Sequence, residues 1–550
     1  MNTVPGNEKF TALTINDPVG NTPGSELIGF DKSKHRNASE ILFQNLDRDP
    51  DAIAVTGPAG TMTYKEICAE ASRWGNAFIA DGLQRGDRIA MLLDDTPTYP
   101  AAIMGAIRAG FVPVLLNTQT RPDLLNYYLA DSASPIIVVD SAFADAVTSE
   151  ALEGTTIRKI VVANAEHNFV HGSDIEAIIS SDFIDGHSDN LEVADTGPDD
   201  MAFWMYSSGS TGRPKGIVHL QHDMAYTAET YAAHILKLQP DDRCFSVPKI
   251  FFAYGFGNAI TFPFFVGASS VLLPGRPEPK RILDAIEAFR PTAFFALPTV
   301  YTALAHAGET SASDLSSLRL SLSAAEILSE DVFMAWRDAS GLEAIEGLGS
   351  TELLHIYLSN TAAEKRLGSA GKVVLGYEVK LCNQEGAAVF PGEDGVMWVR
   401  GHSSAPIYWN RPDKTEETMR GDWIYTGDRF IEKEGFYFFQ GRADDLVKVS
   451  GQWVWPLEVE RCLNESDAVQ EAAVLAHTLE DKRTVLRAVV ALRDGVEGND
   501  DMRGLLRDHI KHHLLPFKAP RIIEFVPELP KTGTGKVDRQ ALTNRTEEKG

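Results

Sequence analysis

Residues 201–216 read MAFWMYSSGSTGRPKG. The run Met201–Tyr206 is apolar and predicts a buried strand, whereas the stretch after it is too rich in glycine and hydroxyl groups to pack in a core. Backbone N–H groups in such a loop can converge on an anion, and Arg213 and Lys215 add positive charge. The stretch therefore predicts a phosphate-binding loop rather than a flexible linker. It differs from the P-loop of ordinary ATPases, where Ser or Thr follows the lysine, because Gly216 stands there in this chain.

Strands and helices alternate on both sides of this loop. Short apolar runs predict strands, and apolar residues at every third or fourth position predict helices. The expected strands are 88–93, 112–116, 136–139, 159–163, 293–297 and 318–322, and helices are expected at 99–109 and 122–132. This alternation is typical of βαβ units and parallel sheets, so the predicted fold class is α/β.

The pattern changes after about Gly376. The runs 377–382, 395–400 and 435–439 are bounded by turn residues and predict a small antiparallel β region. Beyond the charged turn at 441–445, a compact αβ segment is expected, with helices at 456–464 and 502–514 and strands at 472–476, 486–492 and 521–525. We therefore expect a large multi-lobed N-terminal domain at 1–440, a hinge at 441–445 and a small mobile α+β C-terminal domain at 446–550.

Composition limits the kinds of partner. The chain has 550 residues, more than one core can serve, and its formal net charge of -26 repels nucleic acid and anionic membranes. Its four cysteines lie far apart without metal-ligand spacing, and no secretory signal or membrane-spanning run is present in the sequence. These features predict a cytoplasmic monomer or homodimer that binds neither nucleic acid nor membranes.

Four more motifs follow the glycine-rich loop along the chain. They are Glu346–Glu352 (EGLGSTE), Tyr425–Asp428 (YTGD), Gly441–Gly451 (GRADDLVKVSG) and Pro530–Arg539 (PKTGTGKVDR). Together, and in this order, they make the chain resemble the adenylate-forming superfamily of acyl-CoA synthetases, peptide-synthetase adenylation domains and luciferases. The resemblance extends from about residue 40 to about residue 542.

The resemblance implies that the chain binds ATP and Mg²⁺. The implied nucleotide-binding residues are Ser207, Ser208, Gly209, Ser210, Thr211, Gly212, Lys215, Ala325, Glu326, Glu346, Gly347, Leu348, Gly349, Thr351, Asp428, Arg442 and Lys536. Glu352 is the expected ligand of Mg²⁺, which prefers oxygen donors. Leu348 departs from the pattern, because many family members have a tyrosine there that stacks on adenine.

The implied catalytic residues are Lys536, Glu352, Thr351 and Lys448. A mobile Lys536 would stabilise the charge that builds up when the acid attacks the α-phosphate, and Thr351 would donate to that phosphate. In a second state, rotation about Asp444 would bring Lys448, Ser450 and Gly451 toward the thiol of coenzyme A.

The stretch 249–258 (KIFFAYGFGN) is aromatic and punctuated by glycine. A buried structural segment would look the same, but the stretch also suits one wall of an acyl pocket. Here the chain is most similar to benzoate–CoA ligases. This resemblance implies that the substrate is an aromatic acid and that its acyl pocket is lined by Ala253, Tyr254, Gly255, Leu348 and His355. A small aliphatic or heteroaryl acid, a carrier protein in place of CoA, and a non-catalytic nucleotide-binding module remain as alternatives.

Overall fold

The computed structural model of the protein describes residues 29–165, 175–207, 213–383, 386–445, 447–449, 452–479, 483–531, 537–539 and 541–543, apart from the side chains of Asp444, Lys448 and Trp453. It divides into two compact units. One unit is Met1–Val379 with Trp398–Tyr425, and the other is Lys380–Met397 with Thr426–Gly550. The expected hinge at 441–445 lies inside the second unit, and bending at that point stays a prediction.

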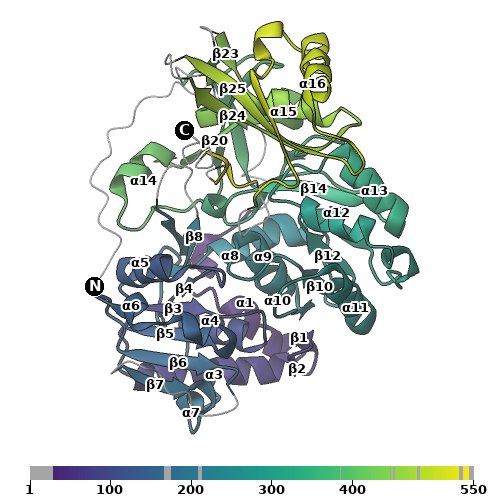
Figure 1. Cartoon of the computed structure of the whole chain (residues 1–550). Helices are drawn as coiled ribbons and strands as arrows, with labels where there is room; N and C mark the ends of the chain where they lie inside the picture. Colours follow the sequence, from purple (N-terminus) through teal and green to yellow (C-terminus); the bar gives the residue numbers. More distant parts are fainter. Residues whose placement is uncertain are drawn as a thin grey trace. The chain divides into compact units, whose positions relative to one another are not determined.

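A seven-stranded sheet with the order β7-β6-β5-β3-β4-β8-β9 forms one half of the first unit (Figure 1). Neighbouring strands are parallel except β8 and β9, which form an antiparallel pair. The strands are β3 (Arg88–Leu92), β4 (Val112–Leu115), β5 (Ile136–Asp140), β6 (Lys159–Ala163), β7 (Glu176–Ile179), β8 (Met201–Ser207) and β9 (Lys215–Leu220). The predicted parallel βαβ arrangement is confirmed.

The longer helices of this half are α3 (Tyr64–Ala80), α4 (Thr98–Arg108) and α5 (Pro122–Ser132). Helices α3 and α4 approach each other at glycines, since a Cβ atom on Gly105 would lie 2.2 Å from the backbone oxygen of Ala71. No side chain fits in that space, so these glycines allow the two helices to pack closely.

A nine-stranded sheet forms the other half, with the order β16-β15-β14-β13-β12-β10-β11-β1-β2. Its middle strands are parallel and its edges are antiparallel. The strands are β1 (Ile53–Gly57), β2 (Gly60–Thr63), β10 (Arg243–Ser246), β11 (Ser269–Val271), β12 (Ala293–Ala296), β13 (Leu320–Ser323), β14 (Ala344–Gly349), β15 (Ile356–Ser359) and β16 (Lys372–Val373).

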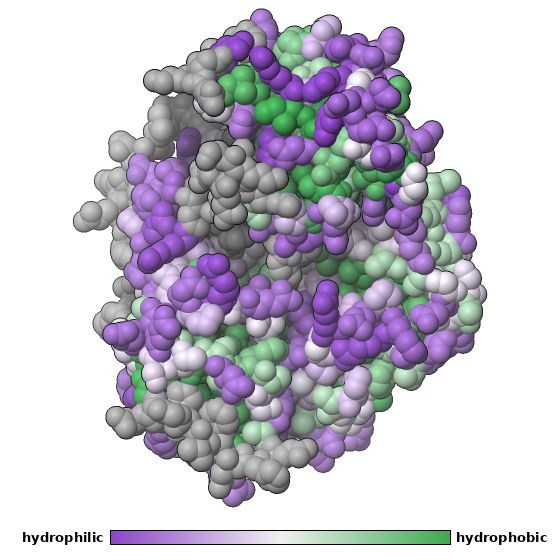
Figure 2. Space-filling model, in the orientation of Figure 1, coloured by the Kyte–Doolittle hydropathy of each residue, from purple (hydrophilic) through white to green (hydrophobic). Residues whose placement is uncertain are grey.

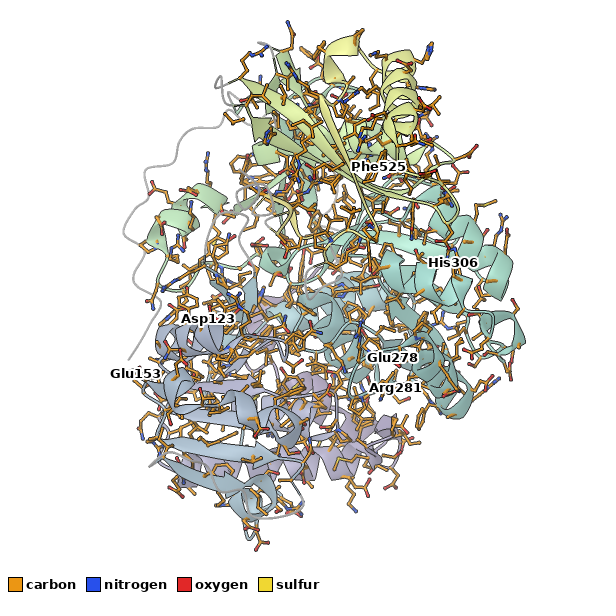
Figure 3. All side chains as sticks on the ribbon, viewed as in Figure 1. Asp123, Glu153, Glu278, Arg281, His306 and Phe525 are labelled. Carbon is orange, nitrogen blue, oxygen red and sulfur yellow. The ribbon has the colours of Figure 1, made fainter. Side chains whose placement is uncertain are left out.

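Helices α11 (Pro279–Phe289), α12 (Pro298–His306) and α13 (Glu330–Ser340) accompany this sheet. Figure 3 marks Glu278, which precedes α11, and His306, the last residue of α12. Buried side chains such as Ile282, Tyr301 and Trp336 pack with Phe294 of β12, so these helices share a core with the sheet.

The second unit ends in a three-stranded sheet, in which β25 (Thr484–Leu492) pairs antiparallel with β24 (Val469–Thr478) and parallel with β26 (Ile522–Val526). Helices α15 (Pro456–Asn464) and α16 (Asp500–His513) share its core. The preceding β region is antiparallel as predicted, because β20 (Trp423–Lys433) pairs with β21 (Phe436–Arg442), and a short hairpin joins β22 (Val447–Val449) to β23 (Gln452–Val454).

Hydrophilic residues are spread widely over the face drawn in Figure 2. Among the helices of the described ranges, none is long and apolar enough to cross a membrane. All four cysteines are buried and unpaired.

Candidate active site

The glycine-rich loop joins β8 to β9, and Ser207 and Lys215 are the last register partners of that hairpin before the loop. Two side chains hold the ends of the loop against α5. The hydroxyl of Tyr206 donates to Asp131 Oδ2 at 2.7 Å, and the hydroxyl of Tyr127 donates to the backbone oxygen of Pro214 at 2.9 Å. The loop therefore starts and ends on a rigid frame, while Ser208, Gly209, Ser210, Thr211 and Gly212 lie outside the described residues.

Tyr408 connects the exit of this loop to the predicted magnesium ligand. Lys215 Nζ lies 4.0 Å from the centroid of the Tyr408 ring, which suits a cation–π contact. The hydroxyl of Tyr408 donates to Glu352 Oε1 at 2.7 Å, and the tyrosine is only 2% exposed. The structure thus brings Lys215 and Glu352 to the same side chain, and Tyr408 is a site residue that the sequence motifs did not reveal.

Backbone pairing places Tyr408 there. Ile217 of β9 forms a β-bridge with Tyr408, and the amide of Trp409 donates to the backbone oxygen of Gly216 at 2.7 Å. The segment around residues 407–409 is thereby added to β9 as a further strand-like edge. The sequence of residues 407–409 by itself does not predict this pairing with β9.

The turn that carries Thr351 and Glu352 is a short 3₁₀ helix, η6 (Thr351–Leu353), between β14 and β15. His219 anchors it, because its Nε2 lies 2.8 Å from the backbone oxygen of Thr351 and its Nδ1 lies 2.8 Å from Asp223 Oδ2. The side chains of His219 and Asp223 are fully buried. A buried, doubly hydrogen-bonded histidine of this kind holds the turn in one position.

Glu352 offers a carboxylate oxygen that can serve as a ligand of a magnesium ion. One carboxylate oxygen accepts from Tyr408, and in the described part of the chain the other, Oε2, makes no hydrogen bond. A hard cation prefers such an oxygen, with phosphate and water completing its ligands. The side chain present therefore fits the ion that the motif implies.

Several residues predicted to bind the nucleotide lie at the carboxyl ends of β13 and β14. Ala325 follows β13 in a left-handed conformation with φ of +73°, which is costly for a residue with a Cβ atom and is found repeatedly at functional sites. Glu346 Oε1 accepts from the backbone amide of Leu328 at 3.1 Å and so fixes the segment beyond Glu326. Ligands of open α/β sheets bind at such strand ends.

Gly347, Leu348 and Gly349 form the end of β14 opposite β15, where Leu348 pairs with Leu358 and Gly349 with Ile356. A Cβ atom on Gly349 would lie 2.4 Å from the backbone oxygen of His355. Only glycine permits this approach, so the turn through Glu352 brings His355 back against β14.

The predicted acyl wall is built from two short helices, α9 (Ala253–Phe256) and the π-helix η4 (Gly257–Thr261). The ring of Tyr254 lies 5.7 Å from that of His355, centroid to centroid. Gly257 contacts the imidazole so closely that an added Cβ atom would lie 2.2 Å from His355 Cδ2. Burial lowers the pKa of His355 to about 3, so the ring is neutral.

A buried ion cluster supports this wall and was also not predicted. Lys249 Nζ lies 2.8 Å from Asp94 Oδ1 and 3.8 Å from Asp95 Oδ2, and Asp95 Oδ1 accepts from the backbone amide of Ile250. Burial raises the pKa of Asp95 to about 6, although Lys249 acts in the opposite direction. The cluster holds the turn that leads into Ala253 and Gly255.

The remaining predicted residues belong to the second unit. Asp428 and Arg442 are register partners on β20 and β21, and Arg442 Nη1 donates to Asp428 Oδ1 at 3.2 Å. The backbones of Asp444 and Lys448 are described but their side chains are not, and Ser450, Gly451 and Lys536 lie outside the described ranges. The roles of these residues stay predictions.

Comparisons with known proteins agree with these observations. Residues 42–409 match the family model of AMP-binding enzymes, and residues 458–536 match that of the AMP-binding enzyme C-terminal domain. A benzoate–CoA ligase of Thauera aromatica is 39% identical over 95% of this chain and 98% of its own length.

Solved structures agree in fold. A benzoate CoA ligase of Burkholderia xenovorans LB400 superimposes with a TM-score of 0.83 at 35% identity, over 92% of this chain and 99% of that one. An anthranilate CoA ligase solved with anthranoyl-AMP gives a TM-score of 0.86 at 35% identity, over 94% and 99% of the two chains. The predicted fold class and superfamily are therefore confirmed: the chain belongs to the AMP-binding enzyme family.

Proposed function

We propose that this protein activates an aromatic carboxylic acid with ATP and transfers the acyl group to the thiol of coenzyme A, releasing AMP and pyrophosphate. One observation carries the proposal. Tyr408 joins Lys215 to Glu352, and the short turn after Glu352 leads to His355 of the aromatic wall. Groups suited to phosphate and groups suited to an aryl acid therefore occur within one unit of the chain.

In the first reaction, a carboxylate oxygen of the acid attacks the α-phosphorus of ATP, and the bond to pyrophosphate breaks. The loop that begins at Ser207 and ends at Lys215 binds the β- and γ-phosphates through backbone amides, hydroxyls and positive charge. Mg²⁺ would be held by Glu352 and would offset the negative charge of the phosphates. Thr351 donates to the α-phosphate.

Lys536 stabilises the charge that develops as the acid and the α-phosphate approach each other. In the second reaction, the sulfur of CoA attacks the acyl carbonyl carbon and AMP leaves. Rotation about Asp444 would exchange Lys536 for Lys448, so that one site serves both reactions. Names of related proteins support CoA as the acceptor, because benzoate– and hydroxybenzoate–CoA ligases are 35–39% identical over most of this chain.

The aromatic wall supports an aryl acid over a small aliphatic one. Tyr254, Phe262 and Tyr231 surround His355 with ring centroids 5.7, 4.4 and 5.6 Å from its own. Flat apolar surfaces of this kind bind an aromatic ring well. A relative named as a p-hydroxybenzoic acid–AMP ligase, 31% identical over 88% of this chain, keeps carrier loading as a second candidate for the acceptor.

The test is the release of AMP and pyrophosphate by the purified protein with Mg·ATP, CoA and a panel of aryl, heteroaryl, short aliphatic and fatty acids. We expect CoA-dependent AMP release to be fastest with an aryl acid. AMP release only with aliphatic acids would refute the aryl assignment. ADP as the product, or no nucleotide product with any acid, would refute the adenylation chemistry.

A further inference from the structure

Asn258 is a buried amide of η4 with almost no partners. It is 0% exposed, and among the residues that the structure describes neither Nδ2 nor Oδ1 makes a hydrogen bond of ordinary geometry. His355 is 2% exposed, and among the described residues neither of its ring nitrogens makes such a hydrogen bond. A buried donor or acceptor left unsatisfied costs about 1–3 kcal/mol, so each such group requires an explanation.

Some buried hydroxyl, carboxylate and indole groups of the described chain also lack partners, but buried amides and imidazoles such as Asn45 and His219 are well bonded. Asn45 donates to the backbone oxygen of Phe264 at 2.7 Å and to two further carbonyls, and Asn360 both donates to Ser369 and accepts from Arg366. Both nitrogens of His219 and of His222 lie 2.8 Å from an oxygen. Among the buried amides and imidazoles that the structure describes, Asn258 and His355 are the ones whose side-chain nitrogens and oxygens lack hydrogen-bond partners.

Tyr254 places these two residues in one neighbourhood. Its ring contacts that of His355, and Asn258 lies close enough to its hydroxyl to influence its pKa. Burial raises the pKa of Tyr254 well above its usual range, and the amide of Asn258 opposes that shift as a nearby N–H donor would. Because the Tyr254 hydroxyl donates to the backbone oxygen of Leu322 at 3.1 Å, its hydrogen is not available to Asn258 Oδ1.

The described residues around His355 offer few hydrogen-bond partners for its ring nitrogens. Burial lowers the pKa of His355, and a backbone group of Tyr254 acts in the opposite direction, but the contact with Tyr254 lacks the geometry of a hydrogen bond. Its neighbours include the rings of Phe262 and Tyr231 and the backbone of Gly257. A neutral imidazole offers one donor and one acceptor, and an amide offers two donors and an acceptor.

We infer that Asn258 and His355 recognise a polar substituent, a hydroxyl or an amino group, on the ring of the aromatic acid. Such a group both donates and accepts, or donates twice, and so supplies what the amide and imidazole lack. The surrounding rings cover the apolar faces of the same acid. This inference rests on the proposed function and narrows it from aryl acids in general to hydroxy- or aminobenzoates. Internal water bonded to the same atoms is the competing occupant.

The experiment compares kcat/KM for AMP release with benzoate, with the three hydroxybenzoates, with the three aminobenzoates, and with the three toluates. A methyl group has nearly the size of a hydroxyl or amino group but forms no hydrogen bond. We expect one polar isomer to exceed the toluate substituted at the same position by about 10- to 100-fold, since a toluate leaves the buried groups unpaired. Benzoate and all toluates equal to or better than every polar acid would overturn the inference.

Asn258→Leu, which retains volume without the amide, tests the residue itself. We expect the ratio of polar acid to toluate to fall at least fivefold while benzoate is still activated. The ratio is measured within one protein preparation, so a partly unfolded variant does not change it. If the ratio of polar acid to toluate is the same in Asn258→Leu as in the parent chain, Asn258 does not recognise the substituent, and internal water is the partner of its amide.

Two controls separate the possible failures. Ser72→Ala removes a buried hydroxyl from α3, where it bonds to the Cys68 carbonyl, and should leave the ratio unchanged. His355→Gln keeps a donor and an acceptor and should retain more of the polar preference than His355→Leu. Absence of AMP with every aromatic acid would refute the proposed function, whereas activation of benzoate without polar preference would refute only this inference.

Discussion

Replacing Tyr408 with phenylalanine removes one oxygen and leaves the ring in place. The lost hydroxyl is the group that donates to Glu352 Oε1 at 2.7 Å, while the ring that faces Lys215 Nζ at 4.0 Å remains. A hydrogen bond to a charged group contributes about 1.5–3 kcal/mol. If this bond holds the carboxylate in place as the adenylate forms, kcat/KM for pyrophosphate release should fall about 10- to 150-fold.

The assay is pyrophosphate release measured over a range of Mg²⁺ concentrations for the parent, Tyr408→Phe, Tyr408→Leu and Glu352→Gln. Tyr408→Leu also removes the ring, and loss of the cation–π contact with Lys215 should cost about 0.5–2 kcal/mol more. The double variant Tyr408→Phe/Glu352→Gln should be hardly worse than Glu352→Gln alone, because both changes disrupt one interaction.

Thermal unfolding of each variant controls for loss of fold, since Tyr408 is buried. The reasoning is refuted if Tyr408→Phe stays within twofold of the parent at every Mg²⁺ concentration. It is also refuted if the effects of Tyr408→Phe and Glu352→Gln multiply, because the tyrosine would then act independently of the carboxylate.

Two further predictions concern the support of the wall and the second unit. Burial raises the pKa of Asp95 to about 6, so the folded protein binds the carboxyl proton of Asp95 more tightly than the unfolded chain does. The protonated carboxyl group therefore adds to the free energy of unfolding. This contribution is complete below about pH 4 and is lost as the pH rises through 6. Relative to Asp95→Asn, the free energy of unfolding in urea should therefore fall by up to about 2–3 kcal/mol between pH 4 and pH 7, and a difference that stays constant or grows with pH would contradict the assignment. Lys536→Ala should abolish adenylate formation while supplied acyl-AMP still reacts with CoA; equal loss of both half-reactions would make Lys536 a structural residue.

Local sequence patterns predicted the regular elements well. Helices α5 and α15 begin and end where the pattern placed them, and each starts with a proline, a residue suited to the first turn of a helix. Strand β24 was predicted at 472–476 but extends over Val469–Thr478. Its pairing with β25 continues past the apolar run, and hydrophobic pattern alone does not reveal how far a strand pairs.

The motifs also named several residues that the fold brings together, although their roles stay predictions. Lys215 and Glu352, chosen from separate motifs, meet at Tyr408, and Tyr254 and His355, chosen for the acyl wall, are in contact. Tyr408 itself was not predicted, nor were the anchoring His219 and the ion cluster around Lys249. His219 and Thr351 are 132 residues apart and Tyr408 and Glu352 are 56 apart, so no spacing within a motif reports these contacts.

The sequence by itself determined the α/β class, the order of the elements and the chemistry of the motifs, because periodicity, turn residues and local charge depend on neighbours within a few positions. Only the tertiary structure decided which side chains meet across the sheets and which buried groups have partners. Asn258 illustrates the difference. The stretch 249–258 drew attention for its aromatic residues and not for its amide, and only the folded chain shows that the amide of Asn258 lacks the hydrogen bonds that Asn45 makes.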